Sequence, residues 1–246
     1  MNRPVNPIIL IPARMSATRL PGKPLALIDG VPMIVRALQC ALDAGIGPVA
    51  VAAGDPEIVA AVQAAGAMAV LTDPLLPSGS DRILAALRQL DPAGKHDAVI
   101  NMQGDMPFEA AASVRACARL LAAGCCDVAT VVAEENDPVA KANPDVVKAI
   151  LAMDSDGQAG RALYFTRSTL YGDGPVWRHI GLYAYTRQTL EGFVVAPQTP
   201  LEKREKLEQL RAMELGVEIW AVIVDTAPIS VDSPADLEAA RKEAAK

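Results

Sequence analysis

The sequence predicts an α/β protein built around a mostly parallel sheet, and three features of the chain support this prediction. Between residues 7 and 133, short apolar runs alternate with longer amphipathic stretches, as in β–α–β units whose helices cover both faces of a parallel sheet. Hydrophobic residues make up 51% of the chain and charged residues 21%, which is ample for a buried core. Glycine and proline separate the apolar runs from the amphipathic stretches, as expected at the ends of strands and helices.

The first part of the chain is predicted to contain strands and helices in alternation. Apolar runs rich in valine, isoleucine and alanine predict buried strands at 7–13, 48–54, 67–73, 97–105 (a strand followed by a turn) and 126–133. Helical spacing of apolar residues predicts helices at 32–45, 56–66, 80–90 and 109–124. Pro56 and Gly66 mark the start and end of the second helix, and Ser80 is the expected N-cap of the third.

After Glu134 the alternation changes, and a mixed insertion is predicted. Strands are expected within 145–168, where a glycine-containing turn joins two of them, and at 176–186 and 217–225. The segment 199–216 has the apolar stripe of an amphipathic helix, with Thr199, Pro200 and Glu202 forming a capping box. A last helix is expected at 233–246.

Composition and charge exclude several classes of protein. The formal net charge is −6, which argues against nucleic acid as a partner because nucleic-acid binding requires a basic face. No apolar stretch approaches the roughly 18 residues of a membrane helix, and the first residues lack the apolar core of a signal peptide. We therefore expect a cytoplasmic protein with no membrane contact. The cysteines at 40, 117, 125 and 126 lack the spacing of a zinc site and are expected to be reduced.

One loop concentrates positive charge in this acidic protein. The segment PARMSATRLPGKPL (12–25) carries Arg14, Arg19 and Lys23 and no acidic residue. It follows the first predicted strand, and ligands of open parallel sheets bind at the carboxyl ends of the strands. Cations without counter-charge repel one another unless an anion joins them, and small residues such as Ala17 and Gly22 would let backbone N–H groups approach that anion. The loop therefore favours a polyphosphate ligand, although it is not a P-loop, and the alternative is a solvated basic loop.

Two aspartates are expected at the same edge of the sheet. Asp105 follows an apolar strand in NMQGDMP, and Asp232 follows a short apolar stretch in ISVDSPAD. Two carboxylates brought together repel, and a divalent cation such as magnesium resolves the repulsion while also binding phosphate oxygens. The alternatives are structural: Asp105 could cap the turn toward Glu109, and Asp232 could accept N–H bonds from the helix that starts near Ser233.

Several motifs occur together in a recognisable order: IPARMSATRLPGKPL, PSGSDR, NMQGDMP, ALYFTRS, RHIGLYAY, PLEKREKLEQLR and SVDSPADLE. With them the chain resembles the cytidylyltransferases that activate the eight-carbon sugar acid Kdo (3-deoxy-manno-octulosonate), over nearly its whole length. The resemblance implies a Rossmann-like nucleotidyltransferase fold, a homodimer, dependence on Mg²⁺ and a role in lipopolysaccharide precursor synthesis. It also implies one domain over 1–246, with a nucleotide-binding half at about 1–134, a sugar-acid and dimer subdomain at about 135–225, and a closing segment at 226–246.

The resemblance assigns roles to individual residues. Catalytic roles are implied for Lys23, Arg14, Asp105 and Asp232, with the two aspartates as metal ligands. CTP would be bound by Arg14, Arg19, Lys23, Ser78, Gly79 and Asp105. The sugar acid would be bound by Arg167, His179, Tyr183, Gln103, Glu208 and Gln209. The expected reaction is attack of the anomeric hydroxyl on the α-phosphorus of CTP, with pyrophosphate as leaving group.

The chain also departs from the pattern that it resembles. Met106 stands where these enzymes usually have glutamate, LLPSGSDR lacks their usual histidine, and the segment STLYGDGPVWRH is short. These departures bear on the identity of the sugar acid more than on the reaction type. One alternative is therefore a cytidylyltransferase for another acidic sugar, such as an amino-substituted Kdo or a sialic-like acid. Another is a sugar-nucleotide binding protein without catalytic activity.

Overall fold

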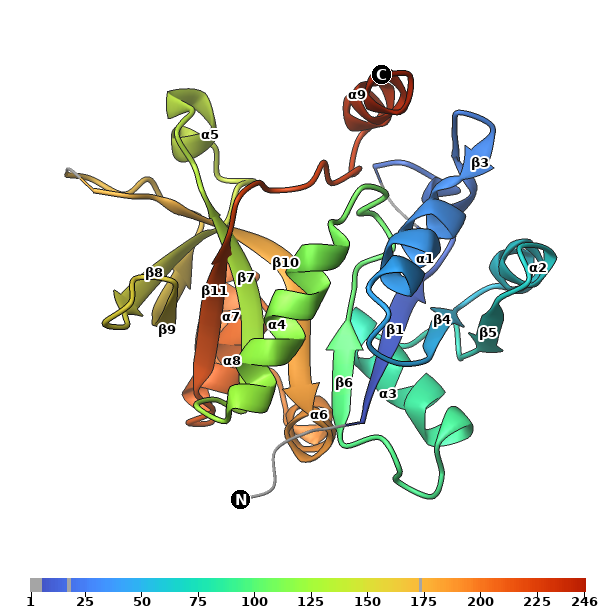
Figure 1. The fold of residues 1–246 in the computed structure, drawn as a ribbon, viewed down its shortest axis with the longest axis horizontal. Helices are drawn as coiled ribbons and strands as arrows, with labels where there is room; N and C mark the ends of the chain where they lie inside the picture. Colours follow the sequence, from blue (N-terminus) through green and yellow to red (C-terminus); the bar gives the residue numbers. More distant parts are fainter. Residues whose placement is uncertain (1–5, 17–18, 173) are drawn as a thin grey trace. The chain divides into compact units, whose positions relative to one another are not determined.

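The computed structural model describes residues 6–16, 19–172 and 174–246. Within it the chain divides into two compact units, each with its own set of strands (Figure 1). The first unit comprises the described residues up to 115 together with 228–246, and the second comprises 116–227.

The sheet of the first unit is parallel. Its strands are β1 (Pro7–Ala13), β4 (Val49–Ala53), β5 (Met68–Leu71) and β6 (Ala98–Asn101), in the order β5-β4-β1-β6. Ile9 and Ile11 of β1 are completely buried, as is the intervening Leu10. Burial of side chains on both faces explains why this strand is a continuous apolar run.

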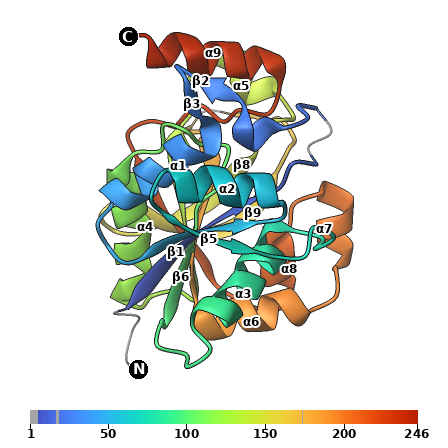
Figure 2. The same cartoon turned by 90° about the vertical axis from the view of Figure 1, so that its right-hand side faces the viewer.

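Helices cover both faces of this sheet. The helices that follow β1, β4 and β5 are α1 (Met33–Asp43), α2 (Pro56–Ala64) and α3 (Gly79–Leu90). Connections between parallel strands are right-handed, so the chain must change face when the strand order reverses. Accordingly, α1 and α2 lie on one face, and α3 packs on β1, β4 and β5 from the other (Figure 2). The order reverses between β1 and β6, which is where open α/β sheets bind ligands.

A small hairpin and the C-terminal helix complete the first unit. The 3-10 helix η1 (Lys23–Leu25) leads into β2 (Leu27–Ile28) and β3 (Val31–Pro32). Asp29 and Gly30 have φ angles of 49° and 72°, as a two-residue type I′ turn requires. The helix α9 (Pro234–Ala244) packs on this hairpin in a cluster of buried apolar residues made of Ile28, Met33, Val231, Leu237 and Ala240. Because Val231 belongs to this cluster, the neighbouring Asp232 is held close to the hairpin that follows Lys23.

The second unit has mixed strand pairing, as predicted for the later part of the chain. Its strands are β7 (Val128–Glu134), β8 (Lys148–Met153), β9 (Ala159–Thr166), β10 (Trp177–Thr186) and β11 (Ile219–Val224). The order is β10-β7-β11-β9-β8, and β8 also pairs with β10, so the series of pairings closes. Only β7 and β11 pair in parallel within this series. Short helices accompany the strands: α5 (Pro138–Ala142), α6 (Arg187–Val195), α7 (Pro200–Glu205) and α8 (Gln209–Glu214). The helix α4 (Ala111–Ala123) contains the boundary between the units.

Two local predictions are wrong. The segment 199–216 is not one helix but α7 and α8, because Lys206 adopts a left-handed conformation with φ 56°. The break lets Arg211 of α8 donate two hydrogen bonds of 2.8 Å to the carboxylate of Glu202 in α7. The N-cap of α3 is Ser78 instead of Ser80, since the Ser78 hydroxyl accepts the N–H of Asp81. The structure also contains α5 and α6, which the sequence pattern did not predict. No helix in the described part of the chain is both long and apolar enough to cross a bilayer.

Candidate functional site

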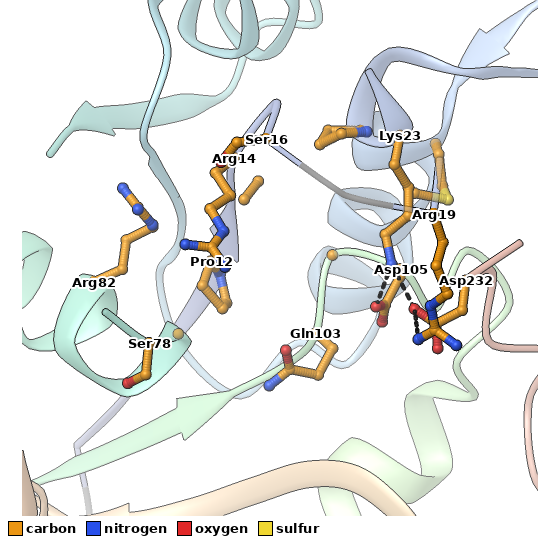
Figure 3. A pocket seen from close by; sticks show the side chains of 15 residues that line it. Pro12, Arg14, Ser16, Arg19, Lys23, Ser78, Arg82, Gln103, Asp105 and Asp232 are labelled. Carbon is orange, nitrogen blue, oxygen red and sulfur yellow. Dashed lines mark hydrogen bonds and ion pairs between the residues drawn. The ribbon is translucent and has the colours of Figure 1, made fainter. Parts of the chain in front are cut away.

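A pocket of about 450 Å³ opens at the carboxyl ends of β1 and β6, inside the first unit. Its volume lies within the roughly 300–1,000 Å³ typical of small-molecule sites. The lining residues are Pro12, Ala13, Arg14, Ser16, Arg19, Lys23, Pro24, Met33, Ser78, Gly79, Arg82, Gln103, Gly104, Asp105 and Asp232 (Figure 3). All the predicted CTP-binding residues and both predicted metal ligands are therefore in one pocket. Gln103, predicted to bind the sugar acid, lines the same pocket.

The pocket has two differently charged sides. Figure 3 shows Arg14, Ser78 and Arg82 on one side and Lys23 with the two aspartates on the other, with Gln103 between them. Close backbone approach at its floor depends on Gly104, where a Cβ atom would lie 3.1 Å from the Pro12 carbonyl oxygen and 3.0 Å from Ile34 Cδ1. A side chain at this position would push β1 and the turn after β6 apart.

Lys23 joins the two aspartates. Its Nζ donates hydrogen bonds to Asp105 Oδ2 at 2.8 Å and to Asp232 Oδ1 at 3.0 Å. Burial alone would lower the pKa of Lys23, but the carboxylates of Asp105 and Asp232 raise it above its ordinary value. The backbone brings the carboxylates together as well, because Val231 N–H donates to the Asp105 carbonyl at 3.0 Å.

The sequence suggested that the cationic loop lacks counter-charge, but in the structure most of its charge is paired. Asp105 and Asp232 neutralise Lys23, and Arg19 lies 3.4 Å from Asp232. Among the residues that the structure describes, Arg14 forms no ion pair, so its guanidinium remains available to an anion. Ala17, expected to help the backbone approach that anion, lies outside the described residues.

Asp232 does not cap the last helix, which was the structural alternative for this residue. The N-cap of α9 is Ser233, whose hydroxyl accepts the N–H of Asp236. Asp236 Oδ2 in turn accepts the N–H groups of Asp232 and Ser233 at 3.1 and 2.8 Å. The Asp232 carboxylate is thus directed to Lys23 and Arg19 while its neighbours cap the helix. The Asp105 carboxylate likewise accepts from Lys23.

Two carboxylates suit a cation that also takes oxygens from a substrate. In the described part of the chain, no group of three or more His, Cys, Asp or Glu side chains has the geometry of a metal site. Asp105 and Asp232 could therefore supply only part of a coordination shell. This donor set matches Mg²⁺, which usually binds one or two carboxylates together with phosphate oxygens and water.

Arg82 is a pocket residue that the sequence reasoning missed. Its guanidinium is almost fully buried and donates to Thr72 Oγ1 at 2.7 Å and to the Asp73 carbonyl at 3.1 Å. Burial and then the neighbouring Arg14 lower its pKa. One feature of the sequence could have indicated it. In the helical pattern of 80–90, Arg82 is four residues before Ala86 and so lies on the same, buried face of the helix. A charged residue on an apolar helix face is unusual unless it is paired.

The second unit brings two of the predicted sugar-acid residues together. The rings of His179 and Tyr183 on β10 are 5.3 Å apart, and Phe165 meets the His179 ring edge-on at 4.9 Å. His179 Nε2 lies 3.1 Å from Thr130 Oγ1. Burial lowers the pKa of His179 to about 3, so the imidazole is neutral at physiological pH.

Three further predicted sugar-acid residues belong to this unit. Arg167 follows β9, and its Nη1 donates to the Pro144 carbonyl at 3.0 Å. Its suggested alternative partner, Asp173, lies outside the described residues. Glu208 precedes α8 and accepts from Arg211 at 3.4 Å, and Gln209 is buried. Burial raises the pKa of Tyr183, and Tyr185 and then Glu208 raise it further.

Comparison with known proteins identifies the class of protein that this fold and pocket belong to. A family model described as cytidylyltransferase matches residues 8–219. The 3-deoxy-manno-octulosonate cytidylyltransferase of Paramagnetospirillum magneticum is 53% identical over 238 residues, which cover 96% of this chain and 97% of that relative. The enzyme of the same name from Rhodospirillum centenum is 54% identical over 239 residues, covering 97% and 93%.

Solved structures agree with this classification. A CMP:2-keto-3-deoxy-manno-octonic acid synthetase complexed with CTP is 35% identical, with a TM-score of 0.88 and 98% of both chains covered. A nucleotidyl transferase from Methanothermobacter thermautotroptrophicus, 18% identical with a TM-score of 0.63, shows the shared fold alone. The chain therefore belongs to the cytidylyltransferases, and within them to the 3-deoxy-manno-octulosonate cytidylyltransferase family. The predicted nucleotidyltransferase fold is confirmed.

Proposed function

We propose that this protein transfers CMP from CTP to the anomeric hydroxyl of Kdo and releases pyrophosphate. The observation that carries the proposal is the pocket at the strand-order reversal, where Lys23 contacts two adjacent aspartates and Arg14 faces them from the opposite side. The same combination fits a nucleoside triphosphate, whose phosphates need cations. The relatives' names and the CTP complex of the similar structure supply the identity of the nucleotide and the acceptor.

The nucleotide would span the pocket. Lys23 and Arg19 would face the phosphates from one side and Arg14 from the other, while Ser78, Gly79 and Arg82 would border the nucleoside. In the reaction, the anomeric oxygen forms a bond to the α-phosphorus as the bond from the α-phosphorus to the pyrophosphate oxygen breaks. The hydroxyl proton is lost, and negative charge grows on the leaving pyrophosphate. Arg14, Arg19 and Lys23 would neutralise that charge, so positioning and charge stabilisation account for most of the catalysis.

Asp105 and Asp232 would hold Mg²⁺ in this pocket. When bound, the cation would neutralise phosphate charge and lower the pKa of the attacking hydroxyl. The protein's own contribution is the close pair of carboxylates, which Lys23 holds in place.

The sugar acid would be bound by residues of the second unit together with Gln103. Arg167 offers forked donors for a carboxylate, and Tyr183 and Glu208 offer a hydroxyl and an acceptor for sugar hydroxyls. Gln209 would contribute from the first turn of α8.

His179 is better suited to a sugar hydroxyl than to the carboxylate. Thr130 has one hydroxyl proton, and the Leu182 carbonyl lies 2.8 Å from its oxygen. With that proton donated to Leu182, Thr130 Oγ1 accepts from His179 Nε2–H at 3.1 Å. Nδ1 of the neutral ring is then an acceptor, which would receive a hydrogen bond from a hydroxyl and repel a carboxylate.

We also propose that the protein is a homodimer formed through its second unit. Leu163 of β9, Met153 of β8 and Tyr171 are exposed apolar side chains of this unit, and exposed apolar surface favours association. Light scattering during gel filtration tests this proposal: a dimeric mass supports it, and a monomer at micromolar concentration contradicts it.

A substrate panel tests the function. Pyrophosphate release should be measured for CTP, UTP, GTP and ATP, each with Kdo, amino-substituted Kdo and a sialic acid, with and without Mg²⁺. We expect the highest kcat/KM for CTP with Kdo and little release without Mg²⁺. If pyrophosphate is released from CTP with another acid but not with Kdo, that acid is the acceptor. CTP binding without release with any acid would indicate a binding protein.

A further inference from the structure

Asp55 occupies a helix-capping position but does not cap the helix. It is the residue before α2, where an aspartate normally accepts an N–H group of the first turn. Instead its side chain makes no capping hydrogen bond, and its Oδ2 accepts the backbone N–H of Met15 at 2.7 Å. Met15 lies 40 residues earlier, in the cationic loop. The carboxylate therefore joins the end of β4 to the start of that loop.

The residue before Asp55 makes a second link to the same loop. Gly54 N–H donates to the Ala13 carbonyl at 2.8 Å, which extends the parallel pairing of β1 and β4 by one step beyond Ala13 and Ala53. The two links flank Arg14, whose preceding carbonyl and following N–H are both held. A Cβ atom at Gly54 would lie 2.7 Å from Arg82 Nη1 and 3.3 Å from Arg14 Cβ, so a side chain here would displace the Arg82 guanidinium.

We propose that Asp55 is a positioning residue that fixes Arg14 for binding of the nucleotide's phosphates, an inference that rests on the proposed function. Two guanidinium groups, Arg14 and Arg82, lie near each other at this side of the pocket, and their repulsion is unfavourable. The Asp55 carboxylate attracts Arg82 and holds the backbone next to Arg14. Without this link Arg14 would lose its fixed direction, and a cation that must first be ordered binds an anion more weakly.

Three substitutions separate positioning from capping. Asp55→Asn keeps an acceptor of the same length, so it should retain most of the link to Met15 N–H. Asp55→Ser is a good helix cap but is too short to reach Met15, so it should preserve α2 while losing the link. Asp55→Ala loses the link and offers no cap in its place. Asp97→Ser is the matched control, because Asp97 accepts the N–H of Asn6 at 3.0 Å at the opposite end of β1.

The test measures hydrogen exchange of the Met15 amide and binding of CTP and of inorganic tripolyphosphate by calorimetry. In Asp55→Ser we expect faster exchange at Met15 and roughly tenfold weaker binding of both ligands, the effect of losing one charge-assisted hydrogen bond. Asp55→Asn should stay within about threefold of wild type, by the same reasoning that a neutral acceptor remains. Asp97→Ser should change neither quantity. In an Arg14→Ala background, Asp55→Ser should weaken binding no further, because its effect acts through Arg14.

Several results would overturn the inference. They are unchanged Met15 exchange in Asp55→Ser, wild-type binding despite faster exchange, or a full additional loss in the Arg14→Ala background. Failure of the proposed function has a different signature, because wild-type protein would then bind tripolyphosphate without preferring CTP. The exchange measurement and the tripolyphosphate comparison would still decide the role of Asp55.

Discussion

The Nζ atom of Lys23 lies 2.8 Å from Oδ2 of Asp105, and this contact joins the cationic loop after β1 to the turn after β6. The same ammonium group reaches Asp232 at 3.0 Å. Lys23 therefore holds the two carboxylates proposed to bind a divalent cation, and it should compete with that cation for them.

The first prediction concerns this competition. Lys23→Met should strengthen Mn²⁺ binding in the absence of nucleotide by several-fold, because two carboxylates lose their internal cation. Electron paramagnetic resonance of free Mn²⁺ measures it without turnover. Arg19→Met should have a smaller effect, since Arg19 is more exposed and lies 3.4 Å from Asp232. Mn²⁺ affinity that is unchanged or lower in Lys23→Met would show that these carboxylates are not the cation site.

The second prediction concerns the aspartates themselves. Asp105→Asn and Asp232→Asn should each lower kcat by a factor of about 10²–10³, the usual loss when one charge-stabilising group is removed from a reaction centre. The melting temperature should change little. Asp236→Asn is the matched control. The Asp236 carboxylate lies four positions after Asp232 and accepts the backbone N–H groups of Asp232 and Ser233 at the start of α9. This substitution should reduce the melting temperature and leave kcat near wild type. A normal rate for Asp105→Asn or Asp232→Asn at saturating Mg²⁺ would remove that residue from the site.

The third prediction concerns the acceptor. Arg167→Lys should raise KM for Kdo by about one or two orders of magnitude, because lysine cannot make a forked contact with a carboxylate. KM for CTP should barely move. Arg161→Lys, an exposed change on β9, the strand that precedes Arg167, should alter neither constant. Loss of CTP affinity in Arg167→Lys would instead place this residue at the nucleotide.

The fourth prediction is a pH dependence of stability. The pKa of His179 is lowered from 6.5 to about 3 by burial. Below pH 6.5 the imidazole is therefore protonated in the unfolded chain but stays neutral in the folded protein. Stability is therefore complete above pH 6.5 and is lost as pH falls toward 3, at up to about 1.4 kcal/mol per pH unit. His179→Asn should remove this component. Urea unfolding of wild type and variant between pH 7 and 5 measures it, and identical pH profiles would contradict the burial of a neutral imidazole.

The sequence pattern predicted the parallel part of the fold because the inner strands β1, β4 and β6 of the first unit are buried on both faces. Strands such as β1 are then continuous apolar runs, and the helices between them have apolar stripes that face the sheet. The break at Lys206 was missed because the charged residues around it suit a helix surface. The break accompanies a tertiary contact, the buried pair of Arg211 and Glu202, which a one-dimensional pattern cannot show.

The pocket was predictable in outline from its strand ends, but its charge balance was not. Arg14, Lys23 and Asp105 follow β1 and β6, so topology alone brings them together. Pairing of Lys23 with Asp232 spans 209 positions in sequence and depends on the packing of α9 against the hairpin at Ile28. Asp55 was missed for a similar reason, because its partner is the backbone N–H of Met15, which carries no signal in the sequence.

The most direct test of the central claim is the fate of an ¹⁸O label placed in the anomeric hydroxyl of Kdo and followed by ³¹P NMR during reaction with CTP and Mg²⁺. Attack of the sugar oxygen on the α-phosphorus predicts a product whose α-phosphorus signal carries the ¹⁸O isotope shift, together with unlabelled pyrophosphate. A CMP signal without the isotope shift would mean that water or another group attacks CTP, and it would contradict transfer of CMP to the sugar acid.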